Sequence, residues 1–199
     1  MENVKKNISA DMSGNILDIK DLAVSFDVYG LRSYVLDGIN FTVKKGQRVG
    51  LVGESGCGKT TTLKAILRVL AKNGRIDSGD IEFEGNSIYG MKADKLAHMR
   101  QTGVGMIFQD PSSALNPVFT IESQFLTALK YAYNKTKTKS ELQKIAIEAL
   151  ESVMLPDPER IMSSYPFQLS GGMRLSVCIA ITIAAGRKVL LAVEPGTSL

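Results

Sequence analysis

Apolar and polar residues alternate in the N-terminal part of the chain. The alternation runs through ILDIKDLAVSFDV (16–28) and returns in INFTV (39–43). A period of two places successive side chains on opposite faces of a strand, so both segments are predicted to be half-buried β-strands. Lys44–Gln47 is predicted to be a hairpin turn and Gly79–Phe83 a further edge strand. The pattern therefore favours an antiparallel β part at the start of the chain.

Continuous apolar runs replace this alternation at three later places. They read RVGLVG (48–53), VGMIFQ (104–109) and VLLAV (189–193). Short runs of this kind are typical of strands that are buried on both faces, as in parallel sheets. We therefore predict three buried core strands.

Helical spacing of apolar residues separates these runs. One helix is predicted after residue 60, and residues 120–155 are predicted to form helices that include a capping box from Ser140 to Gln143. A last helix is predicted to open at Ser170 and to continue to about Ala184. Buried strands that alternate with helices predict an α/β fold with a parallel core sheet.

Composition is that of a soluble globular domain. The chain has 199 residues, of which 44% are apolar and 22% are charged, so one domain with a sizeable core is expected. The 24 basic and 20 acidic residues are interleaved, and the net charge of +4 predicts a solvated mixed surface rather than a nucleic-acid interface.

Two features of the sequence argue against a chain that is embedded in a membrane. Residues 1–14 are polar, lack the apolar core of a signal peptide and are expected to be flexible. The most apolar stretch is interrupted at Arg187–Lys188 before it could cross a bilayer. Any membrane association is expected to come through a partner. Cys57 and Cys178 lie far apart in the sequence and favour a reduced, cytoplasmic setting.

One segment carries a recognisable phosphate-binding pattern. Residues 53–60, GESGCGKT, match G-x-x-x-x-G-K-[ST], a pattern that is itself a standard reference case for phosphate binding. The glycines allow backbone N–H groups to converge on phosphate oxygens, and the following helix directs its positive N-terminus to the same place. Lys59 supplies a charge for the outer phosphates, and the hydroxyl of Thr60 can bind Mg²⁺. The alternative is a glycine-rich turn without function. The nucleotide-binding residues are predicted to be Gly53, Glu54, Ser55, Gly56, Cys57, Gly58, Lys59, Thr60 and Thr61.

Two further segments resemble motifs of the ATP-binding-cassette (ABC) transporter family. LSGGM (169–173) resembles the signature motif, and Gln109 in IFQDPSSALNP (107–117) resembles the Q-loop. Together with GESGCGKT they look most similar to the branch that imports peptides or nickel. The resemblance covers the chain from about Leu17 onward. It implies a P-loop NTPase fold over residues 15–199 with a helical subdomain at about 110–175.

The same resemblance implies the cofactors, partners and location. ATP and Mg²⁺ would bind between two ABC subunits arranged head to tail, with Ser170, Gly171 and Gly172 closing on the nucleotide of the partner. Gln109 would orient the attacking water and the Mg²⁺ and would contact a transmembrane permease subunit. Either Tyr34 or Tyr29 would stack on adenine, with Tyr34 preferred. The protein would lie at the cytoplasmic face of the inner or plasma membrane. Read locally, the two tyrosines could pack on a strand and Ser170 could be only a helix cap.

The last segment departs from the family pattern. VLLAVEP resembles the Walker B segment, but Val193 stands where the family has the aspartate that helps to hold Mg²⁺, while Glu194 is at the position of the general base. Arg174–Val177 lacks the second arginine that this branch has. The sequence is expected to be C-terminally truncated at Leu199, without the phosphate-contacting histidine. His98 is expected to be a surface residue and cannot take that place.

The truncation is expected to affect the core as well as catalysis. In the family a strand that follows the Walker B segment lies between the strands predicted at 48–53 and 189–193. We therefore expect an incomplete core sheet, and unpaired buried backbone groups cost about 1–3 kcal/mol each. Three hypotheses follow: an ATP-hydrolysing subunit of a peptide or nickel importer, a nucleotide-binding module that does not hydrolyse ATP, and a non-functional product of an interrupted gene. A P-loop kinase would leave the signature and Q-loop unexplained.

Overall fold

The computed structural model describes residues 14–108, 110, 114–133 and 135–193, which form two compact units. The first unit runs from Met1 to Leu96 and the second from Ala97 to Leu199. Gln109, Glu194 and the N-terminal segment that was expected to be flexible lie outside the described residues, apart from Gly14.

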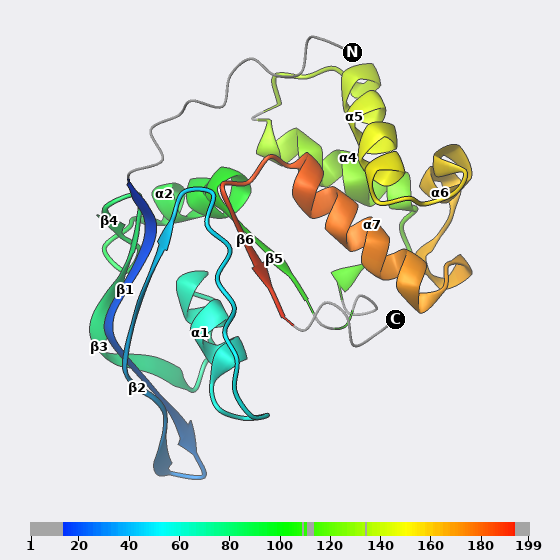
Figure 1. Cartoon of the computed structure of the whole chain (residues 1–199). Coiled ribbons are helices and arrows are strands. Elements are labelled where there is room, and N and C mark those ends of the chain that lie inside the picture. Colours follow the sequence, from blue (N-terminus) through cyan, green and yellow to red (C-terminus); the bar gives the residue numbers. More distant parts are fainter. Residues whose placement is uncertain (1–13, 109, 111–113, 134, 194–199) are drawn as a thin grey trace. The chain divides into compact units, whose positions relative to one another are not determined.

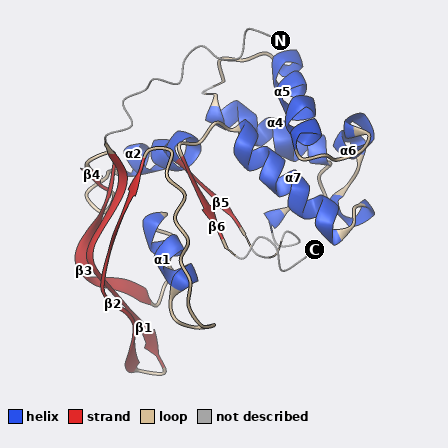
Figure 2. Cartoon of the chain, in the orientation of Figure 1, coloured by secondary structure: helices blue, strands red, loops and turns tan. Residues whose placement is uncertain are grey.

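The first unit is built on an antiparallel four-stranded sheet with the order β2-β1-β3-β4 (Figures 1 and 2). The strands are β1 (Asn15–Val28), β2 (Leu31–Lys44), β3 (Gly74–Phe83) and β4 (Asn86–Ser87). Tyr29 and Gly30 connect β1 to β2 with φ of 49° and 78°. Positive φ at both positions of a two-residue loop suits the twist of a hairpin. The predicted antiparallel β part is therefore confirmed, with longer strands than the pattern indicated.

Apolar side chains of β1 and β3 form the core of this unit. Leu17, Leu22, Val24 and Ile81 are at most 1% exposed. Burial along β1 is not strictly alternate, because the residues from Leu22 to Ser25 are all buried. Helix α1 (Lys59–Ile66) adds its buried residues Thr62, Ala65 and Ile66. Burying such side chains stabilises the unit by about 1.5–3 kcal/mol for each large aliphatic group.

The strand predicted at 48–53 is wrong. Residues 48–53 form no strand and are exposed, and Val52 is 98% exposed. A strand that is buried on both faces needs hydrogen-bonded neighbours in a sheet. The described sheet of this unit is made from β1 to β4 alone, so this apolar run is a solvent-exposed segment without secondary structure. The chain does turn at Lys45–Gly46, but no strand follows directly, so the hairpin predicted at Lys44–Gln47 is wrong.

The second unit combines a short parallel sheet with a helical cluster. The boundary between the units falls inside α2 (Ala93–His98). A π-helical turn at Met99–Gly103 then leads into β5 (Val104–Ile107), which pairs in parallel with β6 (Val189–Ala192). His98 is exposed, as expected. Leu191 is buried but Leu190 is 46% exposed, so β6 is covered on one face only and not on both as predicted.

Among the described residues of this unit, four α-helices form the other part. They are α4 (Ile121–Ala132), α5 (Lys139–Ser152), α6 (Pro158–Ser163) and α7 (Gly171–Ala184), with a 3₁₀ turn at Pro166–Gln168. Their apolar faces share one core. Its most deeply buried members, each fully buried, are Ile121, Phe125, Leu129, Ala146, Leu150, Ile161, Val177 and Ala180. The helices predicted over 120–155 and from Ser170 to Ala184 are confirmed.

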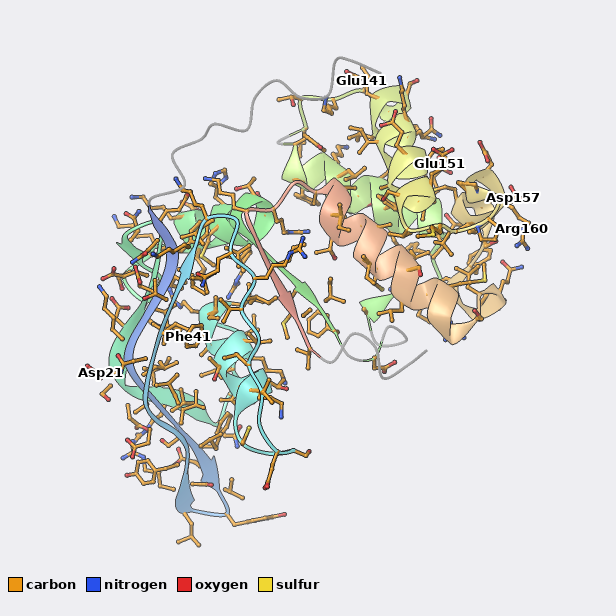
Figure 3. The ribbon with its side chains drawn as sticks, in the orientation of Figure 1. Asp21, Phe41, Glu141, Glu151, Asp157 and Arg160 are labelled. Atoms are coloured by element: carbon orange, nitrogen blue, oxygen red, sulfur yellow. The ribbon has the colours of Figure 1, made fainter. Side chains whose placement is uncertain are left out.

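Side-chain caps determine where these helices begin. The predicted box at Ser140–Gln143 is wrong by two positions, because Thr138 is the N-cap and Glu141 is its partner (Figure 3). The hydroxyl of Thr138 accepts from the N–H of Glu141 at 3.3 Å, and the Glu141 carboxylate accepts from the N–H of Thr138 at 2.8 Å. The hydroxyl of Thr138 also donates to this carboxylate at 2.8 Å. The two hydrogen bonds that the carboxylate accepts, from the N–H and from the hydroxyl of Thr138, lower the pKa of Glu141. Asp157 caps α6 in the same way through the N–H of Arg160.

Candidate nucleotide-binding site

Gly58 joins the glycine-rich loop to helix α1. It adopts φ 96° and ψ 3°, a left-handed conformation that side chains disfavour, and it is buried. A Cβ added here would lie 2.5 Å from Cδ2 of Leu36 and 3.2 Å from the carbonyl oxygen of Val35. Both the conformation and the contact with strand β2 therefore require glycine. The next residue, Lys59, begins the helix.

Lys59 folds back over the loop that precedes it. Its Nζ donates to the carbonyl oxygens of Gly53 and Glu54, both at 2.7 Å, and lies 3.8 Å from Sγ of Cys57. The N–H of Cys57 donates to the carbonyl oxygen of Glu54 at 3.3 Å and closes a turn inside the loop. The ammonium group therefore lies at the concave side of the loop, where it would meet an anion.

The start of α1 adds donors to the same place. The first N–H groups of an α-helix have no partner inside the helix and carry partial positive charge. Thr60 and Thr61 belong to this first turn, and Thr60 is exposed. The hydroxyl of Thr62, one position later, is directed inward and donates to the carbonyl oxygen of Gly58 at 3.1 Å. A mobile ammonium group, exposed first-turn N–H groups and an exposed hydroxyl fit a polyphosphate.

The two candidate adenine-stacking residues lie in different settings. Tyr34 is 66% exposed in β2 and directly precedes Val35, whose carbonyl contacts the Gly58 position. The guanidinium of Arg32 lies 5.5 Å from the centroid of its ring and so covers one face. Tyr29 is fully exposed at the hairpin turn. The assignment of Tyr34 to adenine stacking, with Tyr29 as the alternative, therefore stays a prediction.

In the second unit, Ser170 caps helix α7. Its Oγ accepts from the N–H of Met173 at 3.2 Å, and Arg174 donates through Nε to the carbonyl oxygen of Leu169 at 3.0 Å. Gly171 is exposed, and a Cβ added to it would have no atom within 4 Å. Packing inside the subunit therefore gives no reason for glycine at position 171, in contrast to position 58.

The arrangement offers less to a metal ion than to phosphate. Among the described residues no group of three or more histidine, cysteine, aspartate or glutamate side chains could hold one. Val193 is buried, and its N–H donates to the carbonyl oxygen of Ile107 at 3.1 Å. Thr60 is the candidate ligand that the structure describes. Gln109 and Glu194 were also predicted for this chemistry and lie outside the described residues.

A glycine-rich loop that turns into a helix, with a lysine folded over it, defines the first unit as part of a P-loop nucleotide-binding domain. The sequence Leu-Ser-Gly-Gly at the capped start of helix α7 narrows the class of nucleotide-binding domain to transport ATPases. The chain belongs to the ABC transporter family, which it matches over residues 36–197.

Curated relatives carry names from peptide transport. The chain is 39% identical over 185 residues to an oligopeptide transport ATP-binding protein of Bacillus subtilis. The matched region covers 92% of this chain and 51% of that relative. It is 37% identical over 184 residues to a dipeptide transport ATP-binding protein of Lactococcus lactis, and this match covers 92% of this chain and 52% of that relative. The chain thus spans about half the length of these curated relatives.

A solved structure supports the fold. The chain is similar to a dimeric ATP-binding cassette in a post-hydrolysis state bound to ADP and phosphate, with a TM-score of 0.82 and 26% identity. The similarity covers 92% of this chain and 75% of that one. The predicted P-loop NTPase fold with an antiparallel N-terminal part is therefore confirmed. Within the part of the chain that the structure describes, every helix is too short or too polar to traverse a bilayer.

The two cysteines should differ in reactivity. Cys57 is exposed in the loop, whereas burial raises the pKa of Cys178 to about 11. The thiolate is the reactive form, so at pH 7.5 Cys178 should be alkylated far more slowly than Cys57, and its rate should rise as the pH approaches 11. Iodoacetamide labelling followed by mass spectrometry measures both rates. ATP should slow the labelling of Cys57 alone. Equal rates for the two thiols, or labelling of Cys57 that ATP does not affect, would contradict the described site.

Proposed function

We propose that this chain binds ATP with Mg²⁺ and acts as the ATP-binding subunit of an ABC importer of peptides. The observation that carries the proposal is the position of the Lys59 ammonium over the loop, directly ahead of the N-terminus of α1. The names of the relatives, which are oligopeptide and dipeptide transport ATP-binding proteins, support peptides over nickel as the transported solute.

The proposed chemistry assigns a role to each described residue. Lys59 releases its two loop carbonyls and neutralises the outer phosphates, while N–H groups of Gly58, Lys59 and Thr60 hold phosphate oxygens. The Thr60 hydroxyl binds Mg²⁺, which the phosphates hold as well. Bound Mg²⁺ would offset charge on the leaving phosphates. The remaining predicted loop residues, Gly53, Glu54, Ser55, Gly56, Cys57 and Thr61, shape the cradle.

A second ABC subunit completes the proposed site. Ser170, Gly171 and Gly172 present the N-terminus of α7, and we assign them to the phosphates of the nucleotide held by the partner subunit. The free space around Gly171 supports a contact from outside the subunit. Permease subunits would contact Gln109 and its loop, and this contact would transmit to them the conformational change of the two ABC subunits. The chain would then lie against the cytoplasmic side of a membrane through the permease.

A specific observation favours a second candidate function. Val193 has an apolar, buried side chain at the position that resembles the Walker B aspartate, so one oxygen partner of Mg²⁺ is replaced by a group that cannot bind it. The alternative is a module that binds ATP and does not hydrolyse it, with Glu194 as a base that lacks a well-held metal. Phosphate release by the purified protein separates the two functions.

Replacing Lys59 tests the proposal directly. Lys59→Ala should lower the affinity for ATP by about ten- to a hundredfold, because a charged hydrogen-bond donor to phosphate is lost. Lys64→Ala is the matched control, since Lys64 lies exposed in the last turn of the same helix and should leave affinity unchanged. Isothermal titration with ATP measures both. The proposal is wrong if the folded wild-type protein has no affinity for ATP at any magnesium concentration.

Gly171→Ala separates a structural role from a functional one. Since a Cβ at this position meets nothing within 4 Å, the substitution should leave the urea midpoint unchanged or slightly higher. It should nevertheless weaken ATP-dependent dimerisation, measured by analytical ultracentrifugation, because a methyl group would stand between the helix N-terminus and the phosphates. Ser176→Ala, further along α7, serves as the control. Unaltered dimerisation of Gly171→Ala would remove α7 from the proposed site.

Val193→Asp tests the metal assignment. The substitution should make ATP affinity depend more strongly on Mg²⁺, because a carboxylate can hold the ion or its bound water. It should also lower stability, since the position is buried and an unpaired polar group there costs about 1–3 kcal/mol. Val193→Asn is the matched control of similar size without the charge. If ATP affinity in Val193→Asp shows the same Mg²⁺ dependence as in the wild type, the position is not part of the metal site.

A further inference from the structure

Two stacked aromatic rings lie immediately ahead of the signature segment. The ring centroids of Tyr165 and Phe167 are 5.5 Å apart, and the ring planes differ by 14°. Phe167 is 67% exposed and Tyr165 is 38% exposed. Each ring shields one face of the other, so Phe167 keeps a flat aromatic face in solvent. In the sequence the pair is visible only as YPF (165–167), two aromatic residues shortly before LSGG.

The local backbone fixes the pair relative to helix α7. Pro166 is buried and opens the 3₁₀ turn, and the Gln168 side chain accepts from the N–H of Tyr165 at 2.7 Å. Leu169 is 3% exposed within the helical core, and the next residue is the cap Ser170. A turn closed by its own side chain and followed by a buried anchor leaves the rings little freedom. The rings and the helix N-terminus therefore form one feature of fixed geometry.

We infer that the Tyr165–Phe167 pair stacks on the nucleobase of the ATP that a second ABC subunit holds. This inference rests on the proposed function, in which Ser170 meets the phosphates of the partner's nucleotide. Phe167 is three residues from Ser170, so their Cα atoms are at most about 10 Å apart. The base lies at the opposite end of ATP from the terminal phosphate. One nucleotide can therefore reach both the helix N-terminus and the aromatic face.

The chemistry of the pair favours a base over a protein helix. Aromatic side chains bind bases by stacking, which every base permits through its π-face. A helix that docks on a protein needs a groove with several anchor positions along it. Here a single flat ring face is presented, and the nearby residues Gln168 and Ser170 are polar and exposed. In the partner, Tyr34 would occupy one face of the base, and the Phe167 ring would be available for the other.

Because the chain has no tryptophan, the fluorescence of one introduced indole can report whether a base stacks on it. Phe167→Trp introduces a unique indole whose emission falls when a base stacks on it. The variant Phe167→Trp is combined with Lys59→Ala in one chain, so that this chain presents the ring without gripping a nucleotide itself. It is then mixed with the wild-type chain and titrated with ATP. We expect the indole emission to fall saturably in the mixture and to stay constant when the double variant is titrated alone.

Tyr131→Trp with Lys59→Ala is the matched control. Tyr131 is 53% exposed near the end of α4, while Ile121 at the start of α4 donates from its N–H to the carbonyl oxygen of Ser164 at 2.9 Å. Ten residues of helix place Tyr131 about 15 Å from that end. Its indole should not respond to ATP in the mixture. A second arm uses inorganic triphosphate, which lacks a base and should leave the emission of the Phe167→Trp indole unchanged.

Phe167→Ala in an otherwise unaltered chain gives an independent readout. It should weaken ATP-dependent dimerisation by about tenfold, as expected for one lost base–aromatic stack. The affinity of the monomer for ATP should stay unchanged, because the P-loop of the same chain is intact. Phe167→Tyr, which keeps an aromatic ring at this position, should dimerise with ATP as the wild type does.

The outcomes separate this inference from the proposed function. An indole that stays constant in a mixture that dimerises with ATP overturns the inference and leaves the proposed function standing. Emission that falls on mixing without nucleotide, or equally with triphosphate, identifies a protein–protein contact and also overturns it. A wild-type chain that binds no ATP overturns the proposed function, and the inference is rejected with it.

Discussion

The contact of Gly58 with strand β2 is the constraint on which the nucleotide site depends. Its left-handed conformation turns the loop into α1, and the side chain of Leu36 together with the carbonyl of Val35 leaves no room for a Cβ. The sheet thereby fixes where the helix starts. The helix start in turn fixes the direction of the first-turn N–H groups and places Lys59 so that it can fold over the loop. An exposed loop thus obtains its geometry from a buried neighbour.

The signature segment obtains its geometry in a different way. Buried Leu169 anchors it from one side, and the hydroxyl of Ser170 caps α7 on the other. A Cβ added to the glycine that follows would have no atom within 4 Å, and the two aromatic rings ahead of it are exposed. A segment that is firmly held from inside while its small and aromatic residues face outward is suited to contact a second molecule. This contrast between Gly58 and Gly171 supports a site shared by two subunits.

Local patterns predicted much of the fold because the relevant interactions are local. Alternation of apolar residues located β1 and part of β2, and the segment from Ser170 to Ala184 was predicted as a helix with its correct start. Helical spacing located α4 and α5, but the cap of α5 was placed at Ser140 instead of Thr138. Thr138 and Ser140 are both good caps by type, and only the position of the Glu141 carboxylate decides between them.

The largest departure from prediction is at residues 48–53. Their apolar composition is that of a core strand, but strand formation requires hydrogen-bonding partners that composition does not supply. β6 departs from the prediction for a different reason. Its residues are alternately buried and exposed, so packing covers only one of its two faces. An apolar run shows that a segment can form a buried strand, but the strand forms only where neighbouring strands supply hydrogen-bonding partners.

The sequence by itself determined the phosphate-binding loop, the signature segment and the family, since these depend on residue types at fixed spacing. Only the tertiary structure decided that Gly58 is required by packing while Gly171 is not, that Lys59 lies over the loop, and that Tyr165 and Phe167 form an exposed stack. The physical reason differs between them. The requirement at Gly58 depends on the distance to Leu36 and Val35 in another strand, whereas the position of Lys59 and the aromatic stack depend on the backbone conformation of their own loop and turn, and residue types alone set neither.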